Sequence, residues 1–246
     1  MMNNILVLII KELLNIKKNI LQYIFILFLF PSLLFMFLAI PLSKVFIDLK
    51  PIYSVWVCSG VLFVSVLFNI YVFNLGWFKK MYDNDFMKSL PITTSEYLFS
   101  QISISIIIGF FQYTISVVIL NSLSIGFMNF IQFIKCFFIL FPSMVIISNI
   151  SLIGNYFIKN KFIFNIFNSF VFLFLSFSIG SLVPLDLYPK EYINIISYFP
   201  LSATLINIQN IISFDPLYFS MILISFFYLS VFITLSYYII ESKMKR

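Results

Sequence analysis

The sequence predicts an all-α integral membrane protein with six membrane-spanning helices. Three observations lead to this class: 62% of the 246 residues are hydrophobic, 10% are charged, and the mean hydropathy is +1.08. A soluble domain is about 45–50% apolar and about 25% charged. This chain therefore has too few charges to cover a soluble globule, and its length matches one transmembrane domain, residues 1–246, without a separate soluble one.

Six apolar stretches are long enough to cross the membrane. A helix needs about 20 apolar residues to cross a hydrocarbon core of ~30 Å. Backbone groups in lipid must be satisfied internally, so long unbroken apolar runs form helices. The predicted spans are Asn19–Ile40, Ile52–Leu75, Tyr97–Leu120, Cys136–Ile158, Phe162–Val183 and Leu217–Ile240.

The loop charges predict that both termini lie in the cytoplasm. With this orientation, eleven of the fifteen Lys and Arg residues fall inside, and only Lys44, Lys50, Lys135 and Lys190 fall outside. Cytoplasmic loops carry an excess of positive charge. The expected topology is N-in and C-in, in the cytoplasmic membrane of the cell. The lysines are spread between apolar runs and form no single basic face, so we expect no nucleic-acid partner.

Residues 3–18 precede the first span and have helical amphipathic spacing. Helices with separate polar and apolar faces lie along the membrane surface. We expect an interfacial helix here; the alternative is an extension of the first span into the cytoplasm. The polar face carries Lys11, Asn15 and Lys18, and the apolar face carries Leu6, Ile9, Leu13 and Ile16.

The inner loop from Gly76 to Glu96 is the most polar stretch of the chain and carries both signs of charge. Ser and Thr cap helix starts, and acidic residues favour the first turn. We therefore expect one of residues 93–95 to cap the third span, with Glu96 in its first turn.

The outer segment from Pro184 to Pro216 contains four prolines and is too broken to cross the membrane. Within it, Leu201, Leu205, Ile208 and Ile212 recur with helical spacing. We expect one or two short helices on or in the outer leaflet, between spans five and six. Long, partly apolar connections of this kind usually have a function.

The absence of certain residue types from the sequence disfavours several classes of membrane protein. There is no histidine, and all nine acidic residues fall in loops or at span ends. Ion-coupled carriers and intramembrane metalloenzymes place ionisable groups inside the bundle. No glycine precedes a lysine, so there is no P-loop. We expect a chain that is not an enzyme and binds no cofactor; if ATP drives it, ATP and Mg²⁺ bind to another chain.

Several polar side chains lie inside the predicted spans. Interhelical hydrogen bonds, worth roughly 0.6 kcal/mol each, are one explanation, and lining of a substrate path is the other. Cys58 and Cys136 lie in apolar runs and are expected to be small buried hydrophobic residues. The candidate path-lining residues are Asn69, Asn74, Gln101, Gln112 and Asn149, and further amides are Asn155, Asn165 and Asn168.

Two stretches carry a resemblance to a known family. Residues 83–93 read DNDFMKSLPIT, an acidic and polar run followed by a Leu-Pro-Ile-Thr step into the third span. Residues 184–212 combine Pro-Leu at 184–185, Tyr-Pro at 188–189 and Tyr-Phe-Pro-Leu-Ser at 198–202. With the six-span layout, these stretches resemble the ABC-2 family of ABC-exporter permeases.

The resemblance implies half of an ATP-driven exporter. Two copies, or this chain and a paralogue, would enclose the path, and separate cytoplasmic ABC ATPase subunits would power it. The resemblance also implies that the loop after the second span faces the ATPase. The alternative is that this loop contacts only solvent. The residues so implicated are Lys79, Lys80, Asp83, Asp85 and Lys88 in the coupling loop, and Pro184, Tyr188, Pro189 and Pro200 in an outer gate segment.

Two other functions are compatible with the sequence. One is the membrane-embedded substrate-binding subunit of an energy-coupling importer, which would not need a charged loop after span two. The other is a membrane assembly protein with no transport role. Lipid-linked glycans, peptides, drugs and ions are all compatible with an apolar bundle that has no intramembrane charge.

Overall fold

A computed structural model describes residues 2–46, 53–82, 92–124, 126–158 and 161–244, and within these ranges the chain is helical without strands. The first half contains α1 (Met2–Lys18), α2 (Ile20–Leu34), the π-helical η1 (Phe35–Ala39), α3 (Ile40–Ser43), α4 (Tyr53–Tyr82) and α6 (Thr94–Leu123). The second half contains α7 (Phe130–Phe157), α8 (Lys161–Leu173), the π-helical η2 (Phe174–Ser178), the 3₁₀ turn η3 (Leu185–Leu187), α9 (Lys190–Ile196), α10 (Pro200–Ser213) and α11 (Phe219–Met244).

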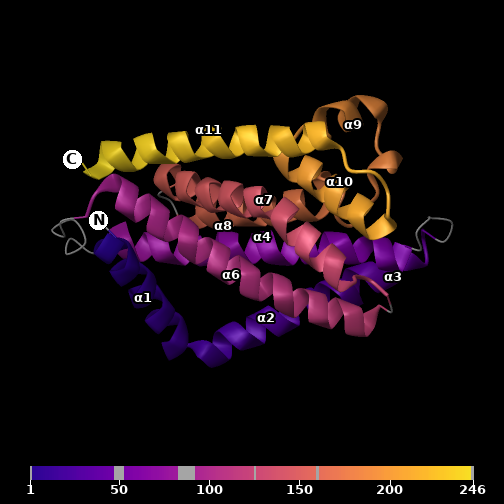
Figure 1. Cartoon of the computed structure of the whole chain (residues 1–246), viewed down its shortest axis with the longest axis horizontal. Helices are drawn as coiled ribbons and strands as arrows, with labels where there is room; N and C mark the ends of the chain where they lie inside the picture. Colours follow the sequence, from indigo (N-terminus) through magenta and orange to yellow (C-terminus); the bar gives the residue numbers. More distant parts are fainter. Residues whose placement is uncertain (1, 47–52, 83–91, 125, 159–160, 245–246) are drawn as a thin grey trace.

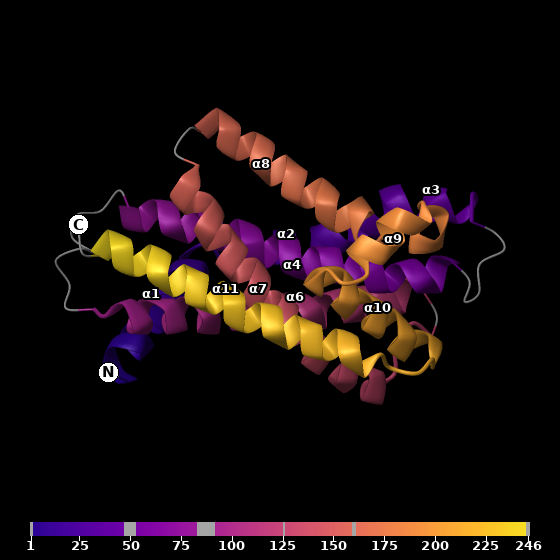
Figure 2. The same cartoon turned by 90° about the horizontal axis from the view of Figure 1, so that it is seen from above.

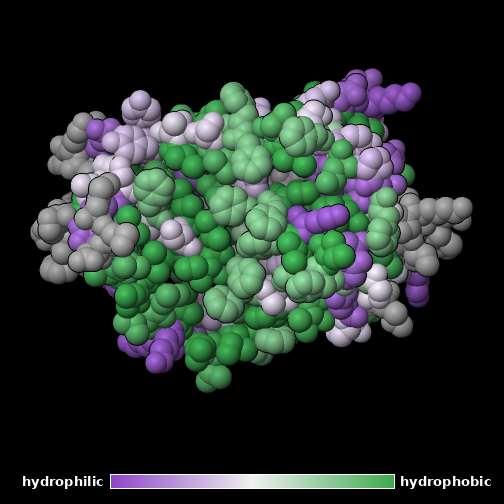
Figure 3. Space-filling model, viewed as in Figure 1, coloured by the Kyte–Doolittle hydropathy of each residue, from purple (hydrophilic) through white to green (hydrophobic). Residues whose placement is uncertain are grey.

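Among the residues that the structure describes, five helices are long and apolar enough to cross a membrane, which indicates a multi-pass membrane protein. Each overlaps one of the six predicted spans, but the bounds differ: the helix of the fourth span begins at Phe130, six residues before the predicted start at Cys136. On the face shown in Figure 3, hydrophobic residues dominate the middle of the molecule and hydrophilic residues gather towards its two ends. The five stretches are Tyr23–Ser43, Tyr53–Leu75, Thr94–Leu123, Phe130–Gly154 and Phe219–Ser242.

The region predicted as the fifth span, Phe162–Val183, differs from the prediction. Its helix ends at Ser178, and Gly180 then adopts a φ of 87°, which starts an irregular turn. Glycine adopts this left-handed conformation without steric cost, so the helix stops short of Val183. The shorter α8–η2 helix nevertheless carries the chain back towards the end where α9 and α10 lie (Figure 2).

α4 forms the centre of the bundle. In an 18-residue apolar stretch of its span 72% of the residues are buried, against 11% for the equivalent stretch of α11. Every residue from Val57 to Leu67 is buried. α4 packs against α2, α6, α7 and α10. The peripheral helices α2 and α11 instead expose large apolar side chains such as Phe25 and Phe227, which suits contact with lipid.

The two ends of the bundle are different. Both termini and α1 lie at one end, and α3, α9 and α10 lie at the other (Figure 1). α9 and α10 meet at an angle of 97°. The two short helices predicted in the outer segment are therefore confirmed, and the four apolar residues of the predicted pattern, Leu201, Leu205, Ile208 and Ile212, are all buried.

Candidate functional site

Most of the charged loop between α4 and α6 lies outside the described residues. Asp83, Asp85 and Lys88 are among the loop residues that the structure does not describe. Lys79 and Lys80 belong to the last turns of α4, which continues to Tyr82. The predicted loop therefore begins about two helical turns later than Gly76, because the α4 helix extends beyond its apolar run. The role of these five residues in coupling stays a prediction.

The start of α6 confirms the predicted cap. Thr93 accepts a hydrogen bond from the backbone N–H of Glu96, and the Glu96 carboxylate accepts one from the N–H of Thr93 at 2.9 Å. This reciprocal pair is a capping box, which satisfies two N–H groups at the helix start. The charged loop is thus joined directly to the beginning of a membrane-spanning helix.

Glu96 also joins α6 to α1. The Glu96 side chain is 2% exposed, and the Asn4 amide donates to its two carboxylate oxygens at 3.3 and 3.4 Å. α1 buries Leu8 and Glu12 while it exposes other apolar residues. It is separated from α2 by a break at Asn19, whose φ and ψ are −116° and 30°. α1 is therefore a distinct helix attached to the start of α6.

A fully buried polar cluster connects α4, α6 and α7. The Asn74 amide donates to the hydroxyls of Ser105 and Ser148, at 2.9 and 3.0 Å. The two hydroxyls lie 2.8 Å apart, and Ser105 donates to the Gln101 carbonyl. Gln101 Nε2 donates to the Ser148 carbonyl at 3.4 Å, and Gln101 Oε1 has no hydrogen-bond partner among the described residues. Such a network fixes how the three helices pack, because each member is buried away from water.

A second polar cluster connects α2, α4 and α6. Asn69 donates to Gln112 Oε1 at 3.0 Å, and Gln112 Nε2 donates to the Leu27 carbonyl at 3.2 Å. Pro31 lies four residues after Leu27 in α2 and has no N–H for this carbonyl. Gln112 therefore supplies the hydrogen bond that the proline removes, as a broken helix in lipid requires.

We expect the Gln112→Ala variant to be destabilised by about 1–3 kcal/mol, because it leaves the partly buried Leu27 carbonyl and Asn69 amide without these partners. In a Pro31→Ala background the penalty should be smaller, since an alanine at that position provides a backbone N–H for the Leu27 carbonyl. Thermal melts of the four proteins in detergent form a double-mutant cycle. Equal penalties in both backgrounds would contradict the link between Gln112 and the proline.

The remaining amides of the predicted set have separate surroundings. Asn149 is buried and donates to the Val145 carbonyl of its own helix at 2.8 Å. Asn168 accepts from the Tyr71 hydroxyl at 2.9 Å, which connects α8 to α4. Asn165 is exposed, and the side chain of Asn155 lies outside the described residues. The structure thus shows interhelical hydrogen bonds at several of these positions, and path lining stays a prediction.

At the opposite end, side chains from several elements hold the irregular turn that follows η2. Tyr188 donates to the Phe177 carbonyl at 3.0 Å, and Tyr192 donates to the Ser178 carbonyl at 2.6 Å. Their rings stack with centroids 5.1 Å apart. Burial raises the pKa of Tyr188 above its usual value, with the neighbouring Tyr192 adding to the shift, so the hydroxyl stays protonated and donates.

The same turn is held from α4 and α10. Ser202 donates to the Ile179 carbonyl and Gln209 to the Gly180 carbonyl, each at 3.2 Å. Tyr53 donates to the Leu182 carbonyl. Together with the two tyrosines of the outer segment, these residues bind backbone oxygens at the end of η2 and in the turn that follows it. Irregular backbone in a membrane protein is tolerated where the protein itself supplies such partners.

The prolines of the predicted gate segment mark the starts of the short elements around this turn. Pro184 and Pro189 directly precede η3 and α9, and Pro200 is the first residue of α10. Proline suits these positions because it fixes φ and needs no hydrogen bond for its nitrogen. The Pro200 carbonyl accepts from Thr204 and from Ser225 of α11, at 2.8 and 3.2 Å. The segment is therefore tied to the last span.

The sequence analysis did not identify the residues outside Pro184–Pro216 that pack against the turn after η2. The main one is Gly60 of α4. A Cβ at Gly60 would lie 1.7 Å from the Ser181 carbonyl oxygen. The one available signal was an isolated glycine inside a helical pattern, where glycine is about 1 kcal/mol less favourable than alanine. Nothing in the pattern identifies the partner, because Ser181 lies 121 positions later in the chain.

The described residues contain no group of three or more His, Cys, Asp or Glu side chains that could hold a metal ion. Cys58 and Cys136 are free and buried, as predicted. Comparison with protein-family models gives no match, and comparison with curated proteins also gives none.

Proposed function

We propose that this chain is the membrane-spanning subunit of an ATP-driven exporter of the ABC-2 type. The observation that carries the proposal is the junction at Glu96, where one buried carboxylate connects α1, the end of the charged loop and the start of α6. A movement imposed on the loop by a soluble partner would reach a membrane-spanning helix through this junction. ATP and Mg²⁺ bind to the partner ATPase and not to this chain.

In this proposal both termini, α1 and the charged loop face the cytoplasm, and α8 completes a set of six crossings. The position of both termini at one end of the bundle supports an even number of crossings (Figure 1). The excess of positive charge assigned to that end supports its cytoplasmic location. α1 would lie at the inner membrane surface, with its exposed apolar residues in contact with lipid.

The outer segment would close the external end of the path. The bent pair α9 and α10 lies at the end of the bundle opposite both termini, and Tyr188 and Tyr192 attach it to the turn after η2. A second copy of the chain, or a paralogue, would complete the enclosure. ATP would drive transport by binding one conformation of the assembly better than the other.

The loop carries both signs of charge, so complementary ion pairs would set how the ATPase docks. We expect Asp83→Lys and Asp85→Lys to weaken association with the ATPase about tenfold, because a like charge then faces the partner. The effect should be stronger at low salt. The measurement is a pull-down of the tagged chain in mild detergent, with mass spectrometry and vanadate-sensitive ATP hydrolysis on the eluate.

The matched control is Asp186→Lys, which makes the same charge change at an exposed position of η3, shortly before α9 at the opposite end of the bundle. It should leave association unchanged. Recovery of the chain without any P-loop ATPase would overturn the proposal. An ATPase that is lost equally from all three variants would overturn the assignment of the loop as its docking surface.

A further inference from the structure

We propose that the exposed face of α1 binds anionic phospholipid at a membrane surface. The proposal rests on the placement of α1 in the proposed function and adds the class of lipid that the helix recognises. Its test requires no ATPase, so the lipid site and the exporter function can fail independently.

α1 carries apolar side chains on two opposite sides. The side that packs against α6 buries Leu8 and Glu12, and Ile9 and Ile16 pack there against a small apolar core that includes α6 residues. The opposite side exposes five large apolar side chains, each 38–63% accessible, so packing within the chain does not account for them. They are Leu6, Val7, Ile10, Leu13 and Leu14.

The exposed apolar residues fall in two neighbouring rows, and each row ends in a lysine. Residues at i, i+4, i+7 and i+11 lie along one face of an α-helix. The rows are Leu6, Ile10, Leu13 and Lys17, and beside them Val7, Lys11, Leu14 and Lys18. The three lysines are exposed. The exposed face is therefore an apolar stripe with cationic groups at its edge and at its C-terminal end.

The charge on this face has one sign. Glu12 is the only acidic residue of the helix, and its side chain is 6% exposed and accepts a hydrogen bond from Asn15 at 3.5 Å. A lysine can lay its methylene stem along apolar surface and keep its ammonium group in the polar layer. Anionic phospholipids offer both partners, because acyl chains cover the apolar rows and phosphates pair with the lysines. Nucleic acid offers the charge without the apolar layer.

The connection to α2 brings α1 to a membrane surface, whichever side of the membrane that is. The candidate span Tyr23–Ser43 begins five residues after Lys18. The chain bends at Asn19 between the two helices, as Figure 1 shows. A helix joined by so short a link to a membrane-crossing helix lies beside the headgroups. Amphipathic helices bind there through apolar burial together with attraction to anionic lipids.

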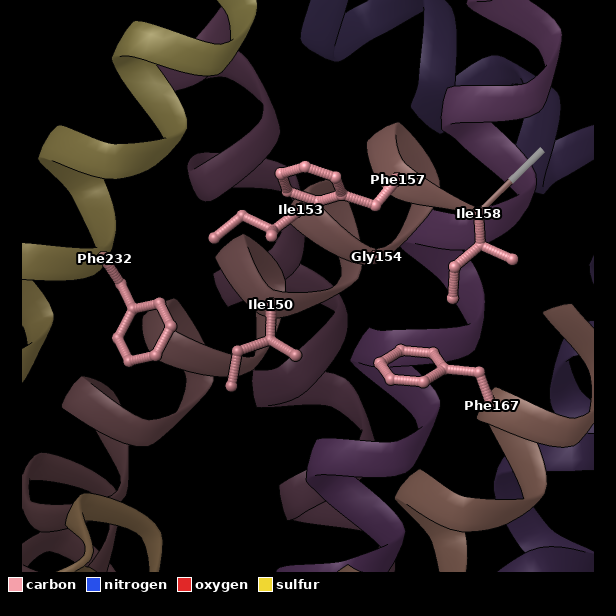
Figure 4. A pocket seen from close by; sticks show the side chains of 7 residues that line it. All are labelled: Ile150, Ile153, Gly154, Phe157, Ile158, Phe167 and Phe232. Atoms are coloured by element: carbon pink, nitrogen blue, oxygen red, sulfur yellow. The ribbon is translucent and has the colours of Figure 1, made fainter. Parts of the chain in front are cut away.

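Other exposed apolar surfaces lack this charge. Residues 219–240 of α11 include no charged residue. The groove between α7, α8 and α11 is likewise lined by uncharged residues (Figure 4). Such surfaces suit acyl chains but give no reason to prefer one headgroup. The groove lining consists of Ile150, Ile153, Gly154, Phe157, Ile158, Phe167 and Phe232.

Fluorescence quenching by spin-labelled lipids in liposomes that contain the full chain tests the site. A thiol-reactive dye on Leu14→Cys reports the lipid beside α1, and the native Cys58 and Cys136 are buried and protected from the dye. Phosphatidylglycerol with a nitroxide on its acyl chain should quench this dye more strongly than the equally labelled phosphatidylcholine. Lys17→Gln with Lys18→Gln should lower the preference for phosphatidylglycerol about fivefold for each lysine removed.

Two controls match this measurement. Lys44→Gln with Lys190→Gln removes two exposed lysines next to α3 and in α9, at the opposite end of the bundle, and should leave the preference at Leu14→Cys unchanged. The dye on Phe227→Cys, an exposed position in the uncharged stretch of α11, should be quenched equally by both lipids.

Three results would overturn the proposal. No quenching at Leu14→Cys by either lipid would show that this face meets water or another protein. Equal quenching by the two lipids would remove the anionic preference. An unchanged preference after loss of Lys17 and Lys18 would show that these lysines only stabilise the C-terminal end of the helix dipole. None of these results depends on recovery of an ATPase.

Discussion

Replacing Gly60 with alanine is expected to prevent the protein from reaching its native packing. The added Cβ would lie 1.7 Å from the carbonyl oxygen of Ser181 and 2.5 Å from its carbonyl carbon. Both are backbone atoms of the turn after η2, so no side-chain rotation relieves the clash. The destabilisation should exceed about 4 kcal/mol, the range reserved for severe defects. The yield of monodisperse protein in detergent and its melting temperature measure the effect.

Gly154→Ala is the matched control for Gly60→Ala. Its Cβ would meet only the edge of the Phe167 ring, at 3.0 Å, and a side chain can shift by a few tenths of an ångström where backbone cannot. Alanine also favours the helix by about 1 kcal/mol over glycine. Gly154→Ala should therefore fold with a melting temperature near that of the wild type. If Gly60→Ala behaves in the same way, the close approach of α4 to Ser181 is wrong.

Replacing Asn74 with leucine is expected to destabilise the protein by about 2 kcal/mol, because a buried polar group that loses its partner costs about 1–3 kcal/mol. Asn74 is fully buried and bonds to Ser105 on α6 and to Ser148 on α7. Leucine has a similar size but removes both bonds and places hydrocarbon beside the two hydroxyls, which keep their contact with each other. Asn69→Leu provides the comparison, because Asn69 is only half-buried and donates one hydrogen bond. The Asn69→Leu variant should lose less stability than Asn74→Leu, closer to the ~0.6 kcal/mol average for an interhelical hydrogen bond.

The same pair of variants separates the two explanations of the amides inside the spans. If Asn74 serves interhelical packing, Asn74→Leu will lower the melting temperature, and any loss of transport will follow the loss of folded protein. If Asn74 lines a path, transport will fall while the melting temperature stays unchanged. Transport in vesicles and thermal melts on the same preparations distinguish these results.

Local patterns in the sequence were sufficient for much of the architecture. Five long apolar helices, the cap at Thr93 and Glu96, and the two short helices of the outer segment all follow from hydropathy, capping preference and helical spacing. Each of these signals acts over a few turns of helix. They need no knowledge of which helices are neighbours.

The same patterns do not predict two helix ends. α4 continues to Tyr82, and the α8–η2 helix ends at Ser178. At the first position the polar composition predicts a loop, although Lys and Met are good helix formers. At the second position the apolar composition predicts a continuous span, although Gly180 turns the chain. Hydropathy measures the preference of a residue for lipid and not its backbone conformation.

The sequence by itself determined that this chain is helical, that most of its helices suit a membrane, and where the capped and proline-bounded starts lie. Only the tertiary structure decided that Gln112 compensates for Pro31, that Glu96 joins α1 to α6, and that Gly60 admits the Ser181 backbone. The physical reason is the range of the interactions. Helix formation and lipid preference depend on neighbouring residues, whereas hydrogen bonds and close contacts between helices depend on side chains that packing brings together from distant parts of the chain.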